Sequence, residues 1–230
     1  MAYALALGAS GSNPVGVRLS PPAFQKGSAR QAGFPQGIGS SSLPLGKKTT
    51  PMKTVIGIIG PIGSGKDTAA IYLAEKLGCK VYEISGHIKK LAHEQGILHD
   101  RQSLIDFGNR IVKERGSEYL PNALLEQISE RGIITGMRQV AQIEYLQKHS
   151  NLILVAIDAD PEIRFKRAQA RGRLGEATTI EEFVRLEKEE NSGDRVQRIF
   201  ECMKMADHSV TNNGTLEELQ KALDDLAKFQ

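Results

Sequence analysis

The sequence predicts an α/β fold, a doubly wound parallel sheet with helices on both faces. From residue 52 onward, runs rich in valine and isoleucine alternate with segments of helical periodicity, and this alternation is typical of parallel sheets. The run 152–157 is apolar throughout, as expected for a strand buried on both faces. A glycine-rich turn follows the run 53–59, and ligands in such sheets bind beyond the carboxyl ends of the strands. The sequence therefore predicts a ligand site at that turn.

Each element is expected from its local pattern. β-branched or continuous apolar runs predict strands at 53–59, 80–84, 132–136, 152–157 and 208–212. Apolar residues that recur every three or four positions predict helices at 69–77, 88–95, 101–115, 121–131, 140–148, 161–171, 180–191, 195–205 and 216–227. Asp100 is expected to cap the helix at 101–115. Ser85-Gly86-His87 is expected to form a turn before the helix at 88–95.

Residues 1–51 differ in composition from the rest of the chain. They are rich in Gly, Ser and Pro, and they carry five basic residues and no acid. Such a segment buries too little apolar surface to offset its ordering entropy, so it is predicted to be a disordered leader ahead of one domain at 52–230. Its composition is that of an organelle transit peptide, but a start-site artefact or a dispensable tail is equally open.

The net charge of +3 does not indicate a nucleic-acid partner. The five positive charges of the leader account for it, and residues 52–230 alone carry about −2, so they offer no general basic surface. Cys79 and Cys202 stand far apart and outside any metal or disulfide motif. No apolar run is long enough to span a membrane. The sequence predicts a soluble, cytoplasmic protein, with organelle import open if the leader is a transit peptide.

The turn at 60–68 has the pattern of a phosphate-binding loop. Glycines allow successive backbone N–H groups to turn inward, the following helix adds positive potential at its N-terminus, and Lys66 supplies a charge for terminal phosphates. The strand before it and the helix after it are the context that such a loop requires. ATP is therefore the expected ligand, and the residues predicted to bind it here are Gly60, Ile62, Gly63, Ser64, Gly65, Lys66, Asp67 and Thr68.

Asp67 stands where a serine or threonine hydroxyl ordinarily holds Mg²⁺. A carboxylate is also a hard oxygen ligand, so Asp67 is predicted to hold the ion directly or through water. The same carboxylate can instead repel the phosphates of the nucleotide.

Several arginines are candidates for binding phosphate. Arg167 and Arg171 are four residues apart, so both are expected on one helix face, before Gly172 and a polar stretch that suits a mobile flap. Arginine suits this task because its planar fork binds phosphate oxygens bidentately. Arg138 follows the strand at 132–136, where it can meet a nucleotide or an acceptor phosphate. Arg110 is expected on a long helix over the acceptor cleft.

These motifs, together with the segment Ala206 to Thr215, resemble nucleoside monophosphate kinases and dephospho-coenzyme A kinases over about residues 53–228. The resemblance implies a P-loop NTPase fold with a helical acceptor-binding insertion and an arginine-bearing lid. It implies that Lys66 neutralises the migrating phosphoryl group, that Arg138 binds the acceptor phosphate or the transfer site, and that Arg171 acts from the lid. It further implies that Arg167 packs by the adenine, and that the residues bordering the base include Asn212 and Gly214.

The reaction that this resemblance implies is ATP- and Mg²⁺-dependent phosphoryl transfer to a small metabolite. A nucleoside monophosphate is the first candidate acceptor. A dephospho-coenzyme A kinase-like enzyme, or a nucleotide-binding regulatory protein with little transferase activity, are the alternatives. Two departures leave the acceptor open. Thr135 stands where such kinases often have an acid, and Ser85-Gly86-His87 replaces the more usual serine-aspartate.

Overall fold

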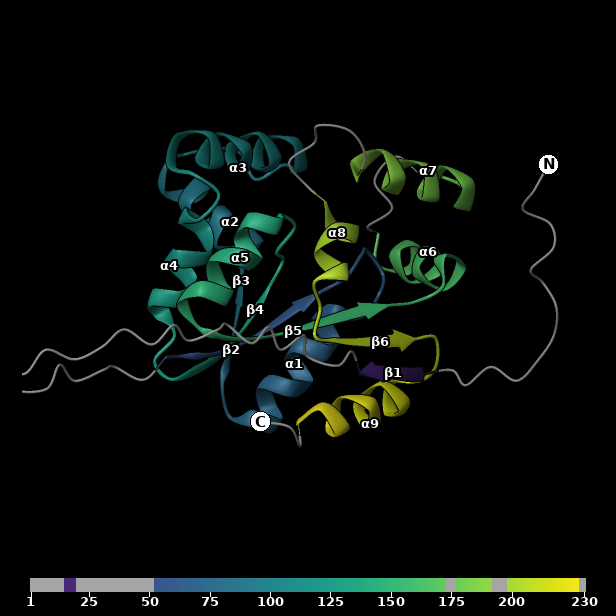
Figure 1. The fold of residues 1–230 in the computed structure, drawn as a ribbon. Coiled ribbons are helices and arrows are strands. Elements are labelled where there is room, and N and C mark those ends of the chain that lie inside the picture. Colours follow the sequence, from purple (N-terminus) through teal and green to yellow (C-terminus); the bar gives the residue numbers. More distant parts are fainter. Residues whose placement is uncertain (1–14, 20–51, 173–176, 192–197, 228–230) are drawn as a thin grey trace, which may run out of the picture.

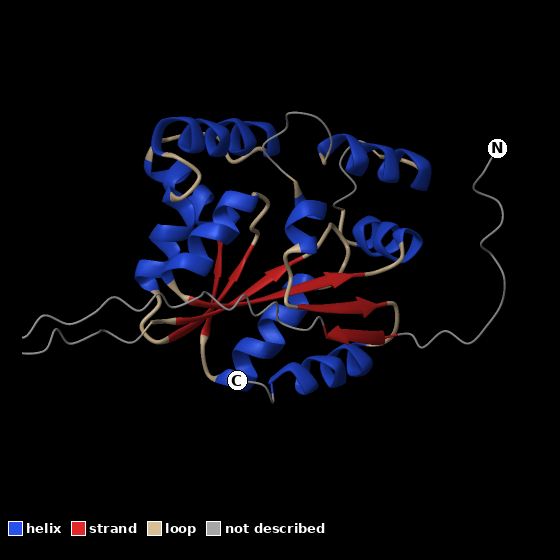
Figure 2. Cartoon of the chain, in the orientation of Figure 1, coloured by secondary structure: helices blue, strands red, loops and turns tan. Residues whose placement is uncertain are grey.

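A computed structural model describes residues 15–19, 52–172, 177–191 and 198–227. It contains one six-stranded sheet with the strand order β1-β6-β5-β2-β4-β3 (Figures 1 and 2). The strands β2 to β6 run parallel, and β1 pairs antiparallel with β6 at the edge. The doubly wound α/β fold is thereby confirmed. The six strands are β1 (Val15–Leu19), β2 (Thr54–Ile59), β3 (Lys80–Glu83), β4 (Arg131–Thr135), β5 (Asn151–Asp158) and β6 (His208–Asn212).

Helices cover both faces of the sheet (Figure 1). One face carries α1 (Lys66–Leu77) and α9 (Leu216–Ala227), and the other carries α5 (Val140–His149) and α8 (Ile199–Lys204). The segment between β3 and β4 forms the predicted helical insertion. It consists of α2 (Ile84–Glu94), α3 (Arg101–Arg115) and α4 (Tyr119–Gln127). The strand β5 is followed by α6 (Pro161–Ala170) and α7 (Ile180–Glu190).

The central strand β2 divides the core in two because its side chains alternate between the faces of the sheet. Val55 and Ile59 pack in the cluster that lies under α5 and α8, and Ile56 and Ile58 pack in the cluster under α1 and α9. All four are buried. This double burial explains why β2 is apolar on both of its sides, and it places the loop that leaves β2 at the centre of the sheet.

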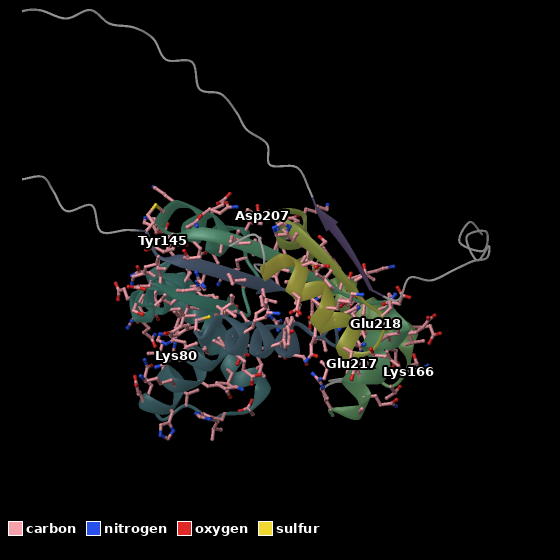
Figure 3. The ribbon with its side chains drawn as sticks, turned by 90° about the horizontal axis from the view of Figure 1, so that it is seen from below. Lys80, Tyr145, Lys166, Asp207, Glu217 and Glu218 are labelled. Atoms are coloured by element: carbon pink, nitrogen blue, oxygen red, sulfur yellow. The ribbon has the colours of Figure 1, made fainter. Side chains whose placement is uncertain are left out.

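The strand β6 is aligned with β5 by Asp207, which lies directly before it (Figure 3). The backbone N–H of Leu154 donates to Asp207 Oδ2 at 2.8 Å, and the Asp207 N–H donates to the Leu154 carbonyl at 2.9 Å. This reciprocal pair sets the register of β6, and the carboxyl end of β6 therefore lies beside the carboxyl end of β5, on the ligand side of the sheet.

Four helix starts differ from the sequence expectation. The helix α1 begins at Lys66 and not at residue 69, and α8 begins at Ile199, while residues 195–197 of that predicted helix lie outside the described part. The helix α2 begins at Ile84, so Ser85-Gly86-His87 lies in its first turn and does not form a separate turn. The Ser85 hydroxyl donates to the Glu83 carboxylate there, which gives this first turn a local polar contact that the hydrophobic spacing did not reveal. The helix α4 begins at Tyr119, and Pro121 is accommodated in its first turn. The predicted cap is confirmed, since Asp100 Oδ1 accepts from the Ser103 N–H at 2.9 Å.

The prediction of a wholly disordered leader is wrong at residues 15–19, which form β1. Valine and leucine alternate with other residues in this run, which suits a strand, and the open edge of β6 supplies the backbone partners that the run lacks by itself. The rest of residues 1–51 lies outside the described part of the chain. Within the described part, no helix combines the length and apolar character that crossing a membrane requires.

Candidate functional site

The glycine-rich loop between β2 and α1 passes close to two other segments. Gly63 has a φ of 80°, and a Cβ there would lie 2.3 Å from the backbone oxygen of Arg164 on α6. Gly65 caps α1 with a φ of 95°, and a Cβ there would lie 2.2 Å from Nδ2 of Asn212 at the end of β6. Both positions therefore require glycine, for the backbone conformation and for the space.

Asn212, the last residue of β6, supports the glycine-rich loop by a hydrogen bond. Its side chain is buried, and its Nδ2 donates to the Ser64 carbonyl at 2.8 Å. Ser64 itself is fully buried, and its Oγ has no hydrogen-bond partner among the described residues. In the structure the side-chain amide of Asn212 contacts the loop. Its predicted place beside the nucleobase of a bound nucleotide stays a prediction. A buried hydroxyl without a partner is the kind of group that a bound ligand can satisfy.

Lys66 and Asp67 open α1 side by side. Lys66 Nζ lies 3.6 Å from Asp67 Oδ1, and the two side chains are 19% and 41% exposed. The lysine that is predicted to bind phosphate therefore has a carboxylate neighbour. Thr68 follows in the same turn and is half-buried. The first turn of α1 thus offers one ammonium group, one carboxylate and one hydroxyl at the positive end of the helix.

The loop also contacts the region predicted to form the lid. Ile62 packs, half-buried, against a small apolar cluster of Ala168 on α6, Ala177, and Phe183 on α7. The rings of Phe165 and Phe183 meet edge to face, with centroids 5.7 Å apart. A change in the path of the loop is therefore transmitted to α6 and α7 by direct packing.

Arg164 on α6 joins three parts of the site, and it was missed by the sequence reading. Its side chain is 5% exposed. Its Nη1 and Nη2 donate to the Glu187 carboxylate of α7 at 2.5 and 2.8 Å, and its Nε donates to the Ala159 carbonyl at 2.9 Å. Its Nε also lies 3.4 Å from Asp158 Oδ1 at the end of β5. The sequence signal was weak because Glu187 stands 23 residues away on a separate helix.

The environment of Asp158 is unfavourable for a charge. Burial raises the pKa of its carboxyl, and the Ala159 N–H and the Arg164 guanidinium oppose that shift. The Glu187 carboxylate adds a further upward effect. Two carboxylates thus share one guanidinium near the loop, and this arrangement depends on Arg164.

Arg167 lies against the end of β6 and the segment that follows it, and its predicted place by the adenine stays a prediction. Its Nη1 donates to the Asn212 carbonyl at 2.9 Å and its Nη2 to the Gly214 carbonyl at 3.4 Å. Burial, and then the charge of Arg171, lowers the pKa of Arg167. Arg171 is exposed at the end of α6, before residues 173–176, which lie outside the described part. Its predicted action from a lid stays a prediction.

Arg138 follows β4, the strand beside β2. Its N–H donates to Gln142 Oε1 at 3.0 Å, and its carbonyl accepts from the Arg198 N–H at 2.8 Å. The Arg138 side chain is exposed. Arg138 and Arg198, which come from distant parts of the chain, are thereby neighbours. The sequence had indicated only Arg138 as a site residue.

The side predicted for the acceptor carries a carboxylate that the sequence reading did not identify. Thr135, at the end of β4, pairs directly with Glu83 at the end of β3. The Glu83 side chain lies against Gly136, where a Cβ would be 3.8 Å from Glu83 Cγ. An acid is thus present on the strand beside Thr135. Burial, and then the charge of Lys90, lowers the pKa of His87, one helical turn after Glu83.

Arg110, on α3, lies in the helical insertion as predicted. Its guanidinium carbon is 5.0 Å from the centroid of the Phe107 ring, and it lines a cavity of 260 Å³ between α2 and α3 together with Gln95 and Glu114. No group of three or more histidine, cysteine, aspartate or glutamate side chains suited to a metal occurs among the described residues.

Comparison with protein families matches residues 56–205 to the family described as an AAA domain (AAA_18). The chain belongs to this family. The match runs from β2 through the loop to the end of α8, so it contains every site element above except the segment around Asn212. The fold of this AAA domain protein is the P-loop fold that the sequence predicted.

The chain is also similar to the following relatives and solved structure. A UPF0200 protein of Sulfurisphaera tokodaii is 29% identical over 176 residues, which cover 76% of this chain and 96% of that protein. A UPF0200 protein of Staphylothermus marinus is 26% identical over 178 residues, which cover 76% and 91%. The structure of TT1252 from Thermus thermophilus has a TM-score of 0.54 and 20% identity, covering 78% of this chain and 99% of that chain. At this identity the likeness shows the fold of the AAA domain protein alone.

Proposed function

We propose that this AAA domain protein is an ATP-dependent phosphotransferase that moves the γ-phosphoryl group of ATP to a small metabolite. One observation carries the proposal: the loop between β2 and α1 requires glycine at Gly63 and Gly65 and opens on Lys66 at the start of α1. A loop of this kind at the centre of a parallel sheet favours a chain of phosphates.

The site residues would act by neutralising phosphate charge and by positioning the substrates. Lys66 would hold the terminal phosphates, and the bond between the γ-phosphorus and its bridging oxygen would break as the acceptor oxygen bonds to that phosphorus. Asp67 with Thr68 would hold Mg²⁺, which would supply positive charge against the charge of the phosphates. These residues fit the ion, since the Asp67 carboxylate is a partly exposed oxygen donor beside Lys66. Arg138 and Arg171 would bind the transferred or the acceptor phosphate.

Arg167 and the segment Asn212 to Gly214 would lie beside the base. Arg167 is already held against the backbone oxygens of Asn212 and Gly214, so its guanidinium face can pack on a ring without a new hydrogen bond. The acceptor would enter between Arg138 and the helical insertion. A nucleoside monophosphate is the first candidate acceptor, and dephospho-coenzyme A is the second.

One contact favours a rival from a different class, a nucleotide sensor with little transferase activity. The distance of 3.6 Å between Lys66 and Asp67 places a negative charge beside the ammonium group that phosphate needs. This arrangement weakens phosphate binding until a metal ion or a conformational change separates the two groups. A sensor needs only that change, whereas an enzyme also needs an acceptor.

The deciding experiment is a panel of nucleoside monophosphates and dephospho-coenzyme A, each assayed for ATP-dependent product with Mg²⁺. Product that forms only with one acceptor and that disappears in Lys66→Ala supports the phosphotransferase. ATP binding by calorimetry without turnover on any acceptor supports the sensor. Absence of ATP binding would contradict both functions.

Asp67→Asn is expected to strengthen metal-free ATP binding, because it removes a like charge within a few ångströms of the phosphates. The same change is expected to weaken Mg²⁺ retention and slow transfer, because a carboxamide is a poorer ligand for a hard cation. Calorimetry with and without Mg²⁺ measures both effects. Glu75→Gln, on the exposed side of α1, is the matched control. If Asp67→Asn leaves metal dependence and rate unchanged, Asp67 has no role at the ion.

Arg171→Lys is expected to slow turnover far more than it weakens ATP binding. The change keeps the charge but loses the planar fork, and closure over the phosphates matters mainly in the transition state. Steady-state rates and ATP affinity separate the two effects. Arg185→Lys, at an exposed position on α7, is the control. Equal rates in Arg171→Lys and the unmodified protein would mean that Arg171 is an ordinary surface residue.

A further inference from the structure

The outer edge of β6 is a surface that accepts an extended strand. On its inner side β6 pairs with β5, and on its outer side residues 208–212 pair with β1 in a continuous antiparallel register from Leu19 opposite His208 to Val15 opposite Asn212. The helix α9 packs against β1 as well as β6 (Figures 1 and 3). Without β1, the outward N–H and C=O groups of β6 would be exposed, which is the usual hazard of an edge strand.

The register connects this edge to the nucleotide loop. Val15 lies opposite Asn212, whose side chain donates to the Ser64 carbonyl and whose own carbonyl accepts from Arg167. Asn212 is thus the residue at which β1, the loop and α6 meet. Gly65 adds a steric contact, since a Cβ there would lie 2.2 Å from Asn212 Nδ2. Small displacements of the carboxyl end of β6 therefore reach the loop directly.

The strand is an addition to the matched domain. The family match begins at residue 56, and the match that covers 76% of this chain already covers 96% of the Sulfurisphaera tokodaii relative. This coverage leaves too little of that relative for a counterpart of residues 1–51.

We propose that residues 15–19 are a docking strand that closes the β6 edge and, through Asn212, holds the nucleotide loop in its binding conformation. Docking adds backbone hydrogen bonds along β6, and it restrains the residue that supports Ser64. Loss of docking lowers ATP affinity because part of the binding free energy must then be used to order the loop. The effect on ATP rests on the proposed function, whereas docking of the strand does not.

The test is the full chain carrying Val17→Pro and Arg18→Pro together. The N–H groups of successive strand residues point to opposite sides, so two adjacent prolines remove the N–H that faces β6, whichever residue carries it. The matched control is Ser40→Pro with Ser41→Pro, two prolines in the same leader outside β1. Hydrogen exchange read by mass spectrometry measures protection of 208–212, and calorimetry measures ATP affinity.

The docked strand predicts that amides of β6 facing β1 lose protection in the Val17/Arg18 variant and keep it in the control. ATP affinity is expected to fall about fivefold in the variant alone, a typical coupling between two sites. Equal protection in both variants would overturn the docking strand. Lost protection with unchanged ATP affinity would overturn its coupling to the loop.

The unmodified chain supplies a second measurement that does not depend on how the variant folds. Amides of 15–19 should be protected in it whether or not ATP is present, and their full exchange within seconds would overturn docking. ATP binding by the unmodified chain tests the proposed function separately, so failure of one conclusion is distinguishable from failure of the other.

Discussion

Lys66→Ala is expected to lower ATP affinity about tenfold or more while the fold survives. The change removes a charge-assisted contact with the terminal phosphates, which is worth roughly 1.5–3 kcal/mol. The side chain stands at the start of α1 and contributes nothing to either main apolar cluster, so the sheet should remain intact. Calorimetric titration with ATP and Mg²⁺ measures the loss, and circular dichroism checks the fold.

Lys76→Ala is the matched control, since Lys76 lies on the same helix but pairs with Asp224 on α9. Its loss removes the contacts with Asp224 and with the Tyr72 ring, far along the helix from the loop, and ATP affinity should not change. Unaltered affinity in Lys66→Ala would refute the assignment of this loop to phosphate, and with it the proposed phosphotransferase.

Arg164→Met is expected to produce the largest loss of stability. The side chains of Arg164 and Glu187 are only 5% and 12% exposed, so removal of the guanidinium leaves a buried carboxylate without its partner. Breaking such a pair costs about 3–5 kcal/mol. For a domain of this size that cost corresponds to a fall of roughly 6–20 °C in the melting temperature. Differential scanning calorimetry gives the measurement.

Two further variants separate charge from packing. Arg185→Met breaks the pair with Glu189, which is exposed on the same helix, and such pairs contribute about 0–1 kcal/mol. Arg164→Met combined with Glu187→Met removes both members of the buried pair and should recover much of the lost stability, because the carboxylate that then remains, Asp158, is 45% exposed. A melting temperature as low in the double variant as in Arg164→Met would indicate that packing, and not charge, explains the loss.

The sequence predicted most of the fold because the controlling patterns are local. The strand β2 is apolar on both sides, and the loop after it has glycines where the structure demands them, among them Gly63 and Gly65. The start of α2 was predicted four residues too late, because the contact between Ser85 and Glu83 replaces a hydrophobic signal.

The parts of the site that escaped prediction depend on contacts between distant segments. Arg164 and Glu187 have no shared period, and their pairing follows from how α6 and α7 pack. The use of Asn212 as a support for Ser64 requires the arrangement of β6 beside the loop. The strand β1 escaped because five residues in a leader rich in glycine, serine and proline carry little signal until the β6 edge is present.

The pairing of β1 with β6 has a consequence for the order in which the molecule is made. The strand β1 is the first described element of the chain, and β6 is followed only by α9 among the described elements. During synthesis β1 therefore cannot pair with β6 until almost the whole domain has been translated. Pairing between such distant residues is also intrinsically slow, since a long loop must close first. Completion of this sheet edge is thus a late step in biogenesis, and newly made molecules pass through a stage in which both strands are open to other partners.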